Sequence, residues 1–175
     1  MARHPMAIAC AAAAALLLLA RPGAAQTEAG EGEASFLNAL EGRFSGTGTL
    51  QSAGGSRRSL KCRFDGDQQG ARLSLDGSCS TALIFSTAIR IELRHDPATG
   101  RYAGSFREST GTVADLGGRR QGERLTLAFT ETAESVRPNP PATLTITRRQ
   151  GGIALTLRGS KPGQGQNLDL ALREE

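Results

Sequence analysis

Few residues in this sequence belong to the types that carry out acid–base or nucleophilic chemistry. His95 and Asp96 stand side by side, and such a pair can exchange protons with a substrate. They open the stretch HDPATG, which is typical of a hairpin turn, so we interpret both as solvated turn residues. Glu108 follows Arg107, and we expect a surface ion pair there instead of a general acid.

The familiar catalytic and cofactor motifs are missing from the sequence. No serine lies in a G-x-S-x-G setting, and there is no H-E-x-x-H motif, no combined cysteine and histidine metal motif and no C-x-x-C-H haem attachment site. The glycines form neither a Rossmann nor a P-loop pattern. We therefore predict a protein that is not an enzyme, with no catalytic residue, metal or cofactor.

Two cysteines have a spacing that indicates disulfide chemistry. If Gly70-Ala71 is a two-residue hairpin turn, Gln69 faces Arg72 and Cys62 faces Cys79 at a non-hydrogen-bonded pair, where side chains approach most closely. An alternative register, with GDQQG as a longer loop, places Ser74 opposite Cys62. We predict a Cys62–Cys79 disulfide, which indicates an oxidising compartment.

Residues 1–25 have the features of a secretory signal peptide. Arg3 gives the positive start, Met6 to Ala20 is an unbroken apolar run, and Gly23-Ala24-Ala25 offers small residues for cleavage. The alternative is a retained membrane anchor, but the run is short for a spanning helix. We expect a periplasmic or secreted protein with no transmembrane segment after processing, and Cys10 leaves with the leader.

The charge of the mature chain is nearly balanced. The sequence has 21 basic and 17 acidic residues, and loss of Arg3 and Arg21 with the leader reduces the net charge from +4 to +2. This balance gives no support for nucleic-acid binding. Three Arg-Arg pairs could bind phosphate or an anionic envelope surface, but they are scattered, and we interpret them as solvated strand faces: Arg57-Arg58, Arg119-Arg120 and Arg148-Arg149.

The hydrophobic pattern after the leader is mostly that of strands. Residues 26–34 are small and acidic, so we expect a flexible N-terminal tether, followed by a short helix over 36–41 that Ser35 caps. From Gly42 onward apolar residues alternate with polar ones. We pair Leu93 with Tyr102 and place a turn at Gly117-Gly118.

Residues 35–175 form one predicted β domain of about nine or ten short strands joined by hairpin turns. No long crossover is present, which favours an antiparallel meander. Because a single sheet of this length tends to close and remove its edges, we predict an all-β, antiparallel up-and-down barrel with a short N-terminal helix. A two-sheet β-sandwich is the alternative.

The stretch FLNALEGRFSGTG resembles the opening of lipocalin-like (calycin-like) barrels, in which a short helix closes one end and a G-x-W begins the first strand. Phe44 stands at the position of that tryptophan. The order GRFSGTG, LKCRF, SLDGSC, GRYAGSFRES and GERLTLAF is also similar to a group of small exported bacterial proteins of unknown function. The resemblance implies export, the disulfide and the barrel, and it implies no activity.

Two function classes fit this fold. In the first, the barrel binds a small apolar or amphipathic ligand, small residues such as Gly46, Gly48 and Gly104 leave room inside, and the loop over 131–141 covers the mouth. In the second, the interior is filled and the domain is a cell-envelope structural or interaction module that meets another protein. The residues that line the cavity, or fill the core, are Phe44, Leu60, Phe64, Ile91, Tyr102, Phe106, Phe129, Ile146 and Leu157.

Overall fold

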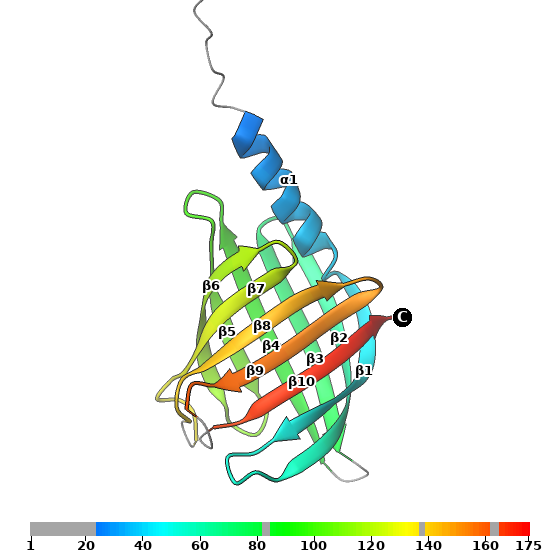
Figure 1. The fold of residues 1–175 in the computed structure, drawn as a ribbon, viewed down its shortest axis with the longest axis vertical. Coiled ribbons are helices and arrows are strands. Elements are labelled where there is room, and N and C mark those ends of the chain that lie inside the picture. Colours follow the sequence, from blue (N-terminus) through cyan, green and yellow to red (C-terminus); the bar gives the residue numbers. More distant parts are fainter. Residues whose placement is uncertain (1–23, 82–84, 137–138, 162–164) are drawn as a thin grey trace, which may run out of the picture.

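The computed structural model describes residues 24–81, 85–136, 139–161 and 165–175. The predicted signal peptide therefore lies mostly outside the described residues. Over these ranges the chain forms one helix, α1 (Ala24–Asn38), and an all-β closed barrel of ten antiparallel strands (Figure 1). The strands are β1 (Gly42–Gln51), β2 (Arg57–Gln69), β3 (Arg72–Thr81), β4 (Phe85–Asp96), β5 (Arg101–Glu108), β6 (Val113–Gln121), β7 (Arg124–Glu131), β8 (Ala142–Arg149), β9 (Gly152–Gly159) and β10 (Asn167–Glu174).

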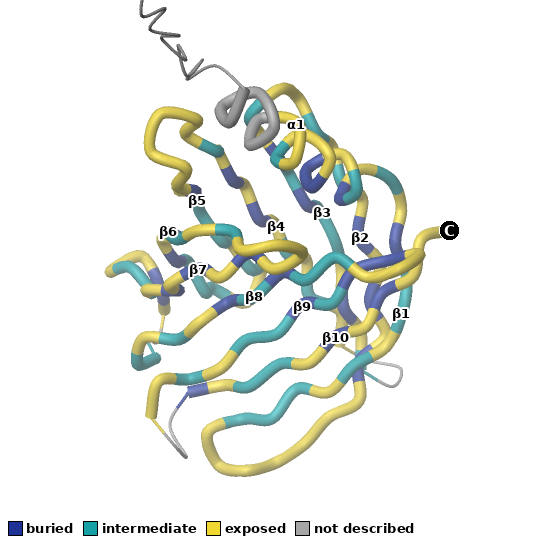
Figure 2. The backbone as a smooth tube through the Cα atoms, turned by 45° about the horizontal axis from the view of Figure 1, so that its top comes forward, coloured by how far each residue is buried: buried dark blue, intermediate teal, exposed yellow. Residues whose placement is uncertain are grey.

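The topology is up-and-down, as predicted, and not a sandwich. Each strand pairs with its neighbours in sequence, and β1 also pairs with β10, from Phe44 opposite Glu174 to Gln51 opposite Asn167. This last pairing closes the sheet, so that the barrel has no free edge. Inward residues alternate with outward ones along each strand, and Figure 2 shows the resulting alternation of buried and exposed positions.

The predicted hairpin register around the two cysteines is confirmed. Gln69 lies opposite Arg72 and Cys62 opposite Cys79, with 4.1 Å between the Cα atoms and the sulfur atoms at disulfide distance. Gly70 has a φ of 60°, as both primed hairpin turns require at their first central residue.

Two other hairpins differ from the prediction. Tyr102 lies opposite His95 and not Leu93, because the turn after Asp96 has four residues. Strand β6 continues through Gly117 and Gly118 and turns only at Gly122, whose φ is 57°. Both shifts preserve the inward and outward faces, because each moves the chain by an even number of residues or extends a strand.

Helix α1 closes one end of the barrel, which we call the plugged end. The predicted start at Ser35 is wrong, since the helix already covers residues 26–34, predicted as a tether, and it ends at Asn38. Phe36, Leu37 and Leu40 are almost completely buried at its C-terminal side. A Cβ atom on Gly66 would lie 1.8 Å from the carbonyl oxygen of Leu40, so only glycine allows the chain to approach β2 there.

The glycines that the sequence suggested as space inside the barrel have another role. A Cβ atom on Gly46, Gly48 or Gly104 would lie about 2 Å from a backbone oxygen of the neighbouring strand. These glycines therefore permit close strand approach and curvature, and they do not line the cavity described below. In the described part of the chain, no helix is long and apolar enough to cross a membrane.

Candidate functional site

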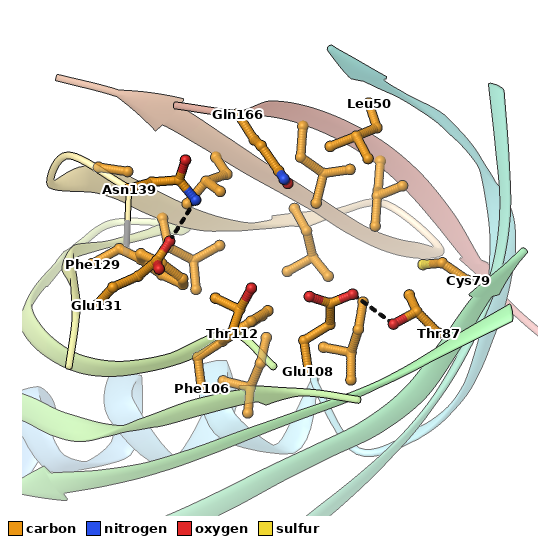
Figure 3. Close-up of a pocket in the computed structure, with 18 of the residues that line it drawn as sticks. Leu50, Cys79, Thr87, Phe106, Glu108, Thr112, Phe129, Glu131, Asn139 and Gln166 are labelled. Atoms are coloured by element: carbon orange, nitrogen blue, oxygen red, sulfur yellow. Dashed lines mark hydrogen bonds between the residues drawn. The ribbon is translucent and has the colours of Figure 1, made fainter. Parts of the chain in front are cut away.

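The end of the barrel opposite the helix is hollow, and we call it the open end. A cavity of about 120 Å³ lies there, lined by residues of β1 to β5 and β7 to β10 and by the loops that precede β6, β8 and β10 (Figure 3). Its walls are mainly aliphatic and aromatic. The apolar lining comprises Leu50, Leu60, Phe64, Cys79, Ile89, Ile91, Phe106, Phe129, Pro140, Ala142, Leu144, Leu155, Leu157, Leu168 and Leu170.

The predicted cavity residues divide between the two halves of the barrel. Leu60, Phe64, Ile91, Phe106, Phe129 and Leu157 line the cavity. Phe44, Tyr102 and Ile146 do not, and are buried in the core toward the plugged end, where side chains fill the interior. The interior is therefore hollow in the half that these six residues line and filled in the other half.

Glu108 is one of two carboxylates that line the cavity. It is the last residue of β5 and points inward, two positions after Phe106. Its Oε1 accepts a hydrogen bond of 2.6 Å from the Thr87 hydroxyl, as Figure 3 shows. The predicted pairing with Arg107 is wrong, because neighbouring strand residues point to opposite faces, and Arg107 lies 3.3 Å from Glu134 on the outside.

Glu131, the last residue of β7, is the second carboxylate. Its Oε1 accepts a hydrogen bond of 2.9 Å from the side-chain amide of Asn139, which belongs to the loop after β7 (Figure 3). Its Oε2 is buried and has no hydrogen-bond partner among the described residues. A buried carboxylate oxygen without a partner is costly, so its presence in the wall of a cavity requires an explanation.

The loop after β7 is anchored in a way that brings Asn139 and Pro140 to the cavity. The Ser135 hydroxyl accepts a hydrogen bond of 2.9 Å from the Val113 amide and donates one of 2.8 Å to the Val113 carbonyl. Ser135 is itself buried. Asn139 and Pro140 then line the cavity, and the prediction that the loop over 131–141 covers the mouth stays a prediction.

The sequence analysis did not place Glu108 or Glu131 inside the barrel, although a signal for their inward position exists. Each follows an inward phenylalanine by two positions, in the motifs F-R-E over 106–108 and F-T-E over 129–131. The two phenylalanine rings meet edge to face with 5.0 Å between their centroids. Extending the two-residue period by one more step along each strand would have placed both carboxylates inside.

A second polar cluster fastens the helix to the plugged end, and the sequence did not predict it either. Glu33 of α1 accepts hydrogen bonds from the Tyr102 hydroxyl and, at 2.8 Å, from Nε of Arg120. The Arg120 guanidinium lies 5.3 Å above the Phe36 ring, and its Nη1 donates to the Gly122 carbonyl at 2.7 Å. Arg120 is thus largely buried in a contact with the helix and not on a solvated strand face.

The ionisation of this cluster follows from its contacts. Burial alone would raise the pKa of Glu33, but the hydrogen bonds from Arg120 and Tyr102 outweigh it and hold the pKa below its usual value. Burial and the hydrogen bond to Glu33 raise the pKa of Tyr102 far above its usual range. At neutral pH the cluster therefore holds a charged Glu33, a neutral Tyr102 and a charged Arg120.

The remaining candidate groups have structural contacts. Asp96 accepts hydrogen bonds from the Ala98 amide and the Thr99 hydroxyl within its own turn, at 3.0 and 2.7 Å. The His95 ring lies against Tyr102, with 5.0 Å between centroids. Within the described ranges, no three histidine, cysteine, aspartate or glutamate side chains gather closely enough to hold a metal ion.

The fold has a counterpart of known structure. The crystal structure of Rv2717c from M. tuberculosis matches with a TM-score of 0.64, over 82% of this chain and 97% of that chain, at 12% sequence identity. At this identity the likeness shows a shared fold. No family model matches the chain, and no match is found among curated proteins.

Proposed function

We propose that the protein binds a small apolar or amphipathic molecule in the cavity at the open end of the barrel. The observation that carries this proposal is the division of the interior, in which one half is filled and the other is hollow and lined by apolar side chains. Barrels with more than about eight strands leave interior space that side chains alone do not fill. Apolar walls with a few polar groups are the usual composition of a ligand pocket.

The cavity volume limits the ligand. At about 120 Å³ it is smaller than the pockets of drug-sized ligands, which measure about 300–1,000 Å³. It is close to a cavity of about 150 Å³ that is known to hold benzene. Several lining side chains, including Leu50 and Leu157, are only partly buried, so a longer ligand would project out of the mouth. We therefore propose a ligand with a buried part of about six to eight heavy atoms.

Export belongs to the same proposal. The apolar leader over residues 1–25 and the cysteine pair support a periplasmic or secreted location, because disulfides persist in oxidising compartments. Under this proposal the ligand is a molecule met outside the cytoplasm, and the protein acts by binding it and not by chemical conversion.

A titration of the purified protein with toluene, followed by saturation-transfer NMR, tests the proposal. Ala142 lines the cavity, and the variant Ala142→Leu adds side-chain volume there. We expect it to weaken toluene binding about tenfold or more, because the larger side chain and the ligand compete for the same space. Overpacking of a protein interior costs about 1–3 kcal/mol. Ala128→Leu is the matched control, because Ala128 is exposed on the outer face of β7. Equal binding by the two variants, or none by the unsubstituted protein, would overturn the proposal.

A second candidate function is supported by a different observation. Phe85 and Val136 are the large apolar residues that remain mostly exposed in the described part of the chain, and both lie near the open end. Contiguous exposed apolar patches mark contact surfaces, whereas single exposed apolar residues are common, so this observation carries less weight than the cavity. Absence of toluene binding in the titration would favour this alternative, in which the open end contacts another envelope protein.

A further inference from the structure

We propose that the ligand of the cavity carries a positive charge, and that a primary ammonium group of the ligand binds between Glu108 and Glu131. This inference rests on the proposed function and specifies the class of molecule that the cavity selects. The ligand is then a small cationic amphiphile, with an apolar tail of about the size of a phenyl ring inside the barrel and its ammonium group close to the mouth.

The charge of the cavity wall is the first basis for this inference. The described lining contains two carboxylates and no lysine, arginine or histidine. The other polar lining residues are Thr87, Thr112, Asn139 and Gln166, all of which can accept hydrogen bonds. The wall therefore offers negative charge and acceptors to a ligand, which favours a cation and disfavours a carboxylate or a phosphate.

The unpaired oxygen of Glu131 is the second basis. Glu33 at the plugged end receives hydrogen bonds on both carboxylate oxygens, whereas Glu131 receives one, on Oε1 from Asn139. A buried charged oxygen without a donor is unfavourable, and a donor that enters the cavity relieves that cost. The terminal torsion of a glutamate is soft, so a small rotation presents Oε2 to the cavity.

The layering of side chains along β5 and β7 fits such a ligand. Phe106 and Phe129 form an aromatic floor, and Glu108 and Glu131 follow one inward position closer to the mouth on the same strands. Figure 3 shows both carboxylates beside the apolar side chains of one cavity. An ammonium has three donors on a compact group, and Glu108, Glu131 and Thr112 offer acceptors in the wall of the same cavity.

A metal ion fits this arrangement less well. Glu108 and Glu131 gain no third histidine, cysteine or carboxylate neighbour within the described residues. Thr87 and Asn139 donate hydrogen bonds to the two glutamates, and these bonds orient the carboxylates for either kind of cation. An organic cation needs no fixed coordination number, so two carboxylates are enough for it.

Four compounds of the same shape test the inference: toluene, benzyl alcohol, benzylamine and benzoate. Their affinities for the purified protein at neutral pH are compared by calorimetry or competition NMR. We expect benzylamine, which is protonated at this pH, to bind about tenfold more tightly than benzyl alcohol, and benzoate to bind most weakly. Glu108→Gln and Glu131→Gln should each reduce the affinity for benzylamine about tenfold and change that for toluene less than about twofold.

Glu134→Gln is the matched control, because Glu134 lies at the same end but is exposed and pairs with Arg107 outside the cavity. It should leave all four affinities unchanged. Binding of toluene and benzyl alcohol with no preference for benzylamine would overturn the inference and leave the proposed function standing. Failure of all four compounds to bind would overturn both. A benzylamine preference that survives both cavity substitutions would overturn the assignment to Glu108 and Glu131.

Discussion

The two ends of the barrel differ in how they satisfy the carboxylate oxygens of a partly buried glutamate. At the plugged end, Glu33 is held by Tyr102 and Arg120, and both carboxylate oxygens have partners. At the open end, Glu131 has one partner, Asn139, and one oxygen without any among the described residues. The difference indicates that the first carboxylate stabilises the fold and that the second is not explained by folding. This contrast is the reason why we place the proposed ligand at the open end.

Truncating a core side chain should destabilise the protein more at the plugged end than at the open end. The largest loss of unfolding free energy is expected where the chain leaves the helix. Leu40 is completely buried, so Leu40→Ala removes a side chain from a filled interior and should lower the free energy of unfolding by about 2–5 kcal/mol. Leu157→Ala, in the partly exposed cavity wall, should cost about 1 kcal/mol. Urea denaturation measures both values. Equal losses would contradict the division into a filled and a hollow half.

The glutamate that fastens the helix should come second in size. Glu33→Gln replaces charge-assisted hydrogen bonds from Arg120 and Tyr102 with weaker ones, and should cost about 1–3 kcal/mol near pH 7. Because the folded-state pKa of Glu33 lies below its ordinary value of 4.5, this contribution is present above that value. It is lost as the pH falls through the folded-state pKa.

The pH dependence provides the check on that prediction. The stability difference between the unsubstituted protein and Glu33→Gln should be constant from about pH 6 to 8 and should shrink below about pH 4.5. Asp76 and Asp96 also have lowered pKa values, but they are present in both proteins and cancel in the difference. A stability difference that grows as the pH falls would have the wrong sign. It would contradict the claim that the ionised Glu33 carboxylate stabilises the fold.

The same substitution at the open end should have the smallest effect, with the opposite sign. Glu131→Gln removes a buried charge whose Oε2 lacks a donor, and it keeps an oxygen for Asn139. We expect the free energy of unfolding to stay the same or to rise by up to about 1 kcal/mol. Thermal and urea denaturation of this variant beside Glu33→Gln give a direct comparison. A loss as large as that of Glu33→Gln would show that Glu131 also serves the fold.

The barrel was predictable from the sequence because its strands and hairpin turns are each determined by residues close together in the chain. Alternating apolar residues defined the strands, and Gly70 fixed the register that brings Cys62 opposite Cys79. Only neighbouring strands in the sequence are involved in each of these steps. Register errors arose where the turn was longer than assumed, as after Asp96, or where glycines lay inside a strand, as at Gly117 and Gly118.

The helix and the cavity depend on contacts that the sequence does not display. Glu33 is 69 positions from Tyr102 and 87 from Arg120, so nothing in the small, acidic stretch over 26–34 indicated that the barrel would hold it. The size of the cavity depends on how the inward side chains of ten strands pack, which no single strand determines. The alternation of inward and outward residues also predicts the inward position of Glu108 and Glu131. It was not applied to them because the strands were not expected to extend that far.

Within the described residues, the pairing of β1 with β10 is the one hydrogen-bonded pairing of strands that lie far apart in the sequence. Every other strand pair joins neighbours in the chain and is able to form as a local hairpin, whereas β1 waits for β10, which lies more than a hundred residues further on. We therefore expect the hairpins to form early and the β1–β10 seam to close last, as the rate-limiting step. Until the strand Asn167–Glu174 has been synthesised, we expect the sheet to keep free edges that can pair with other chains.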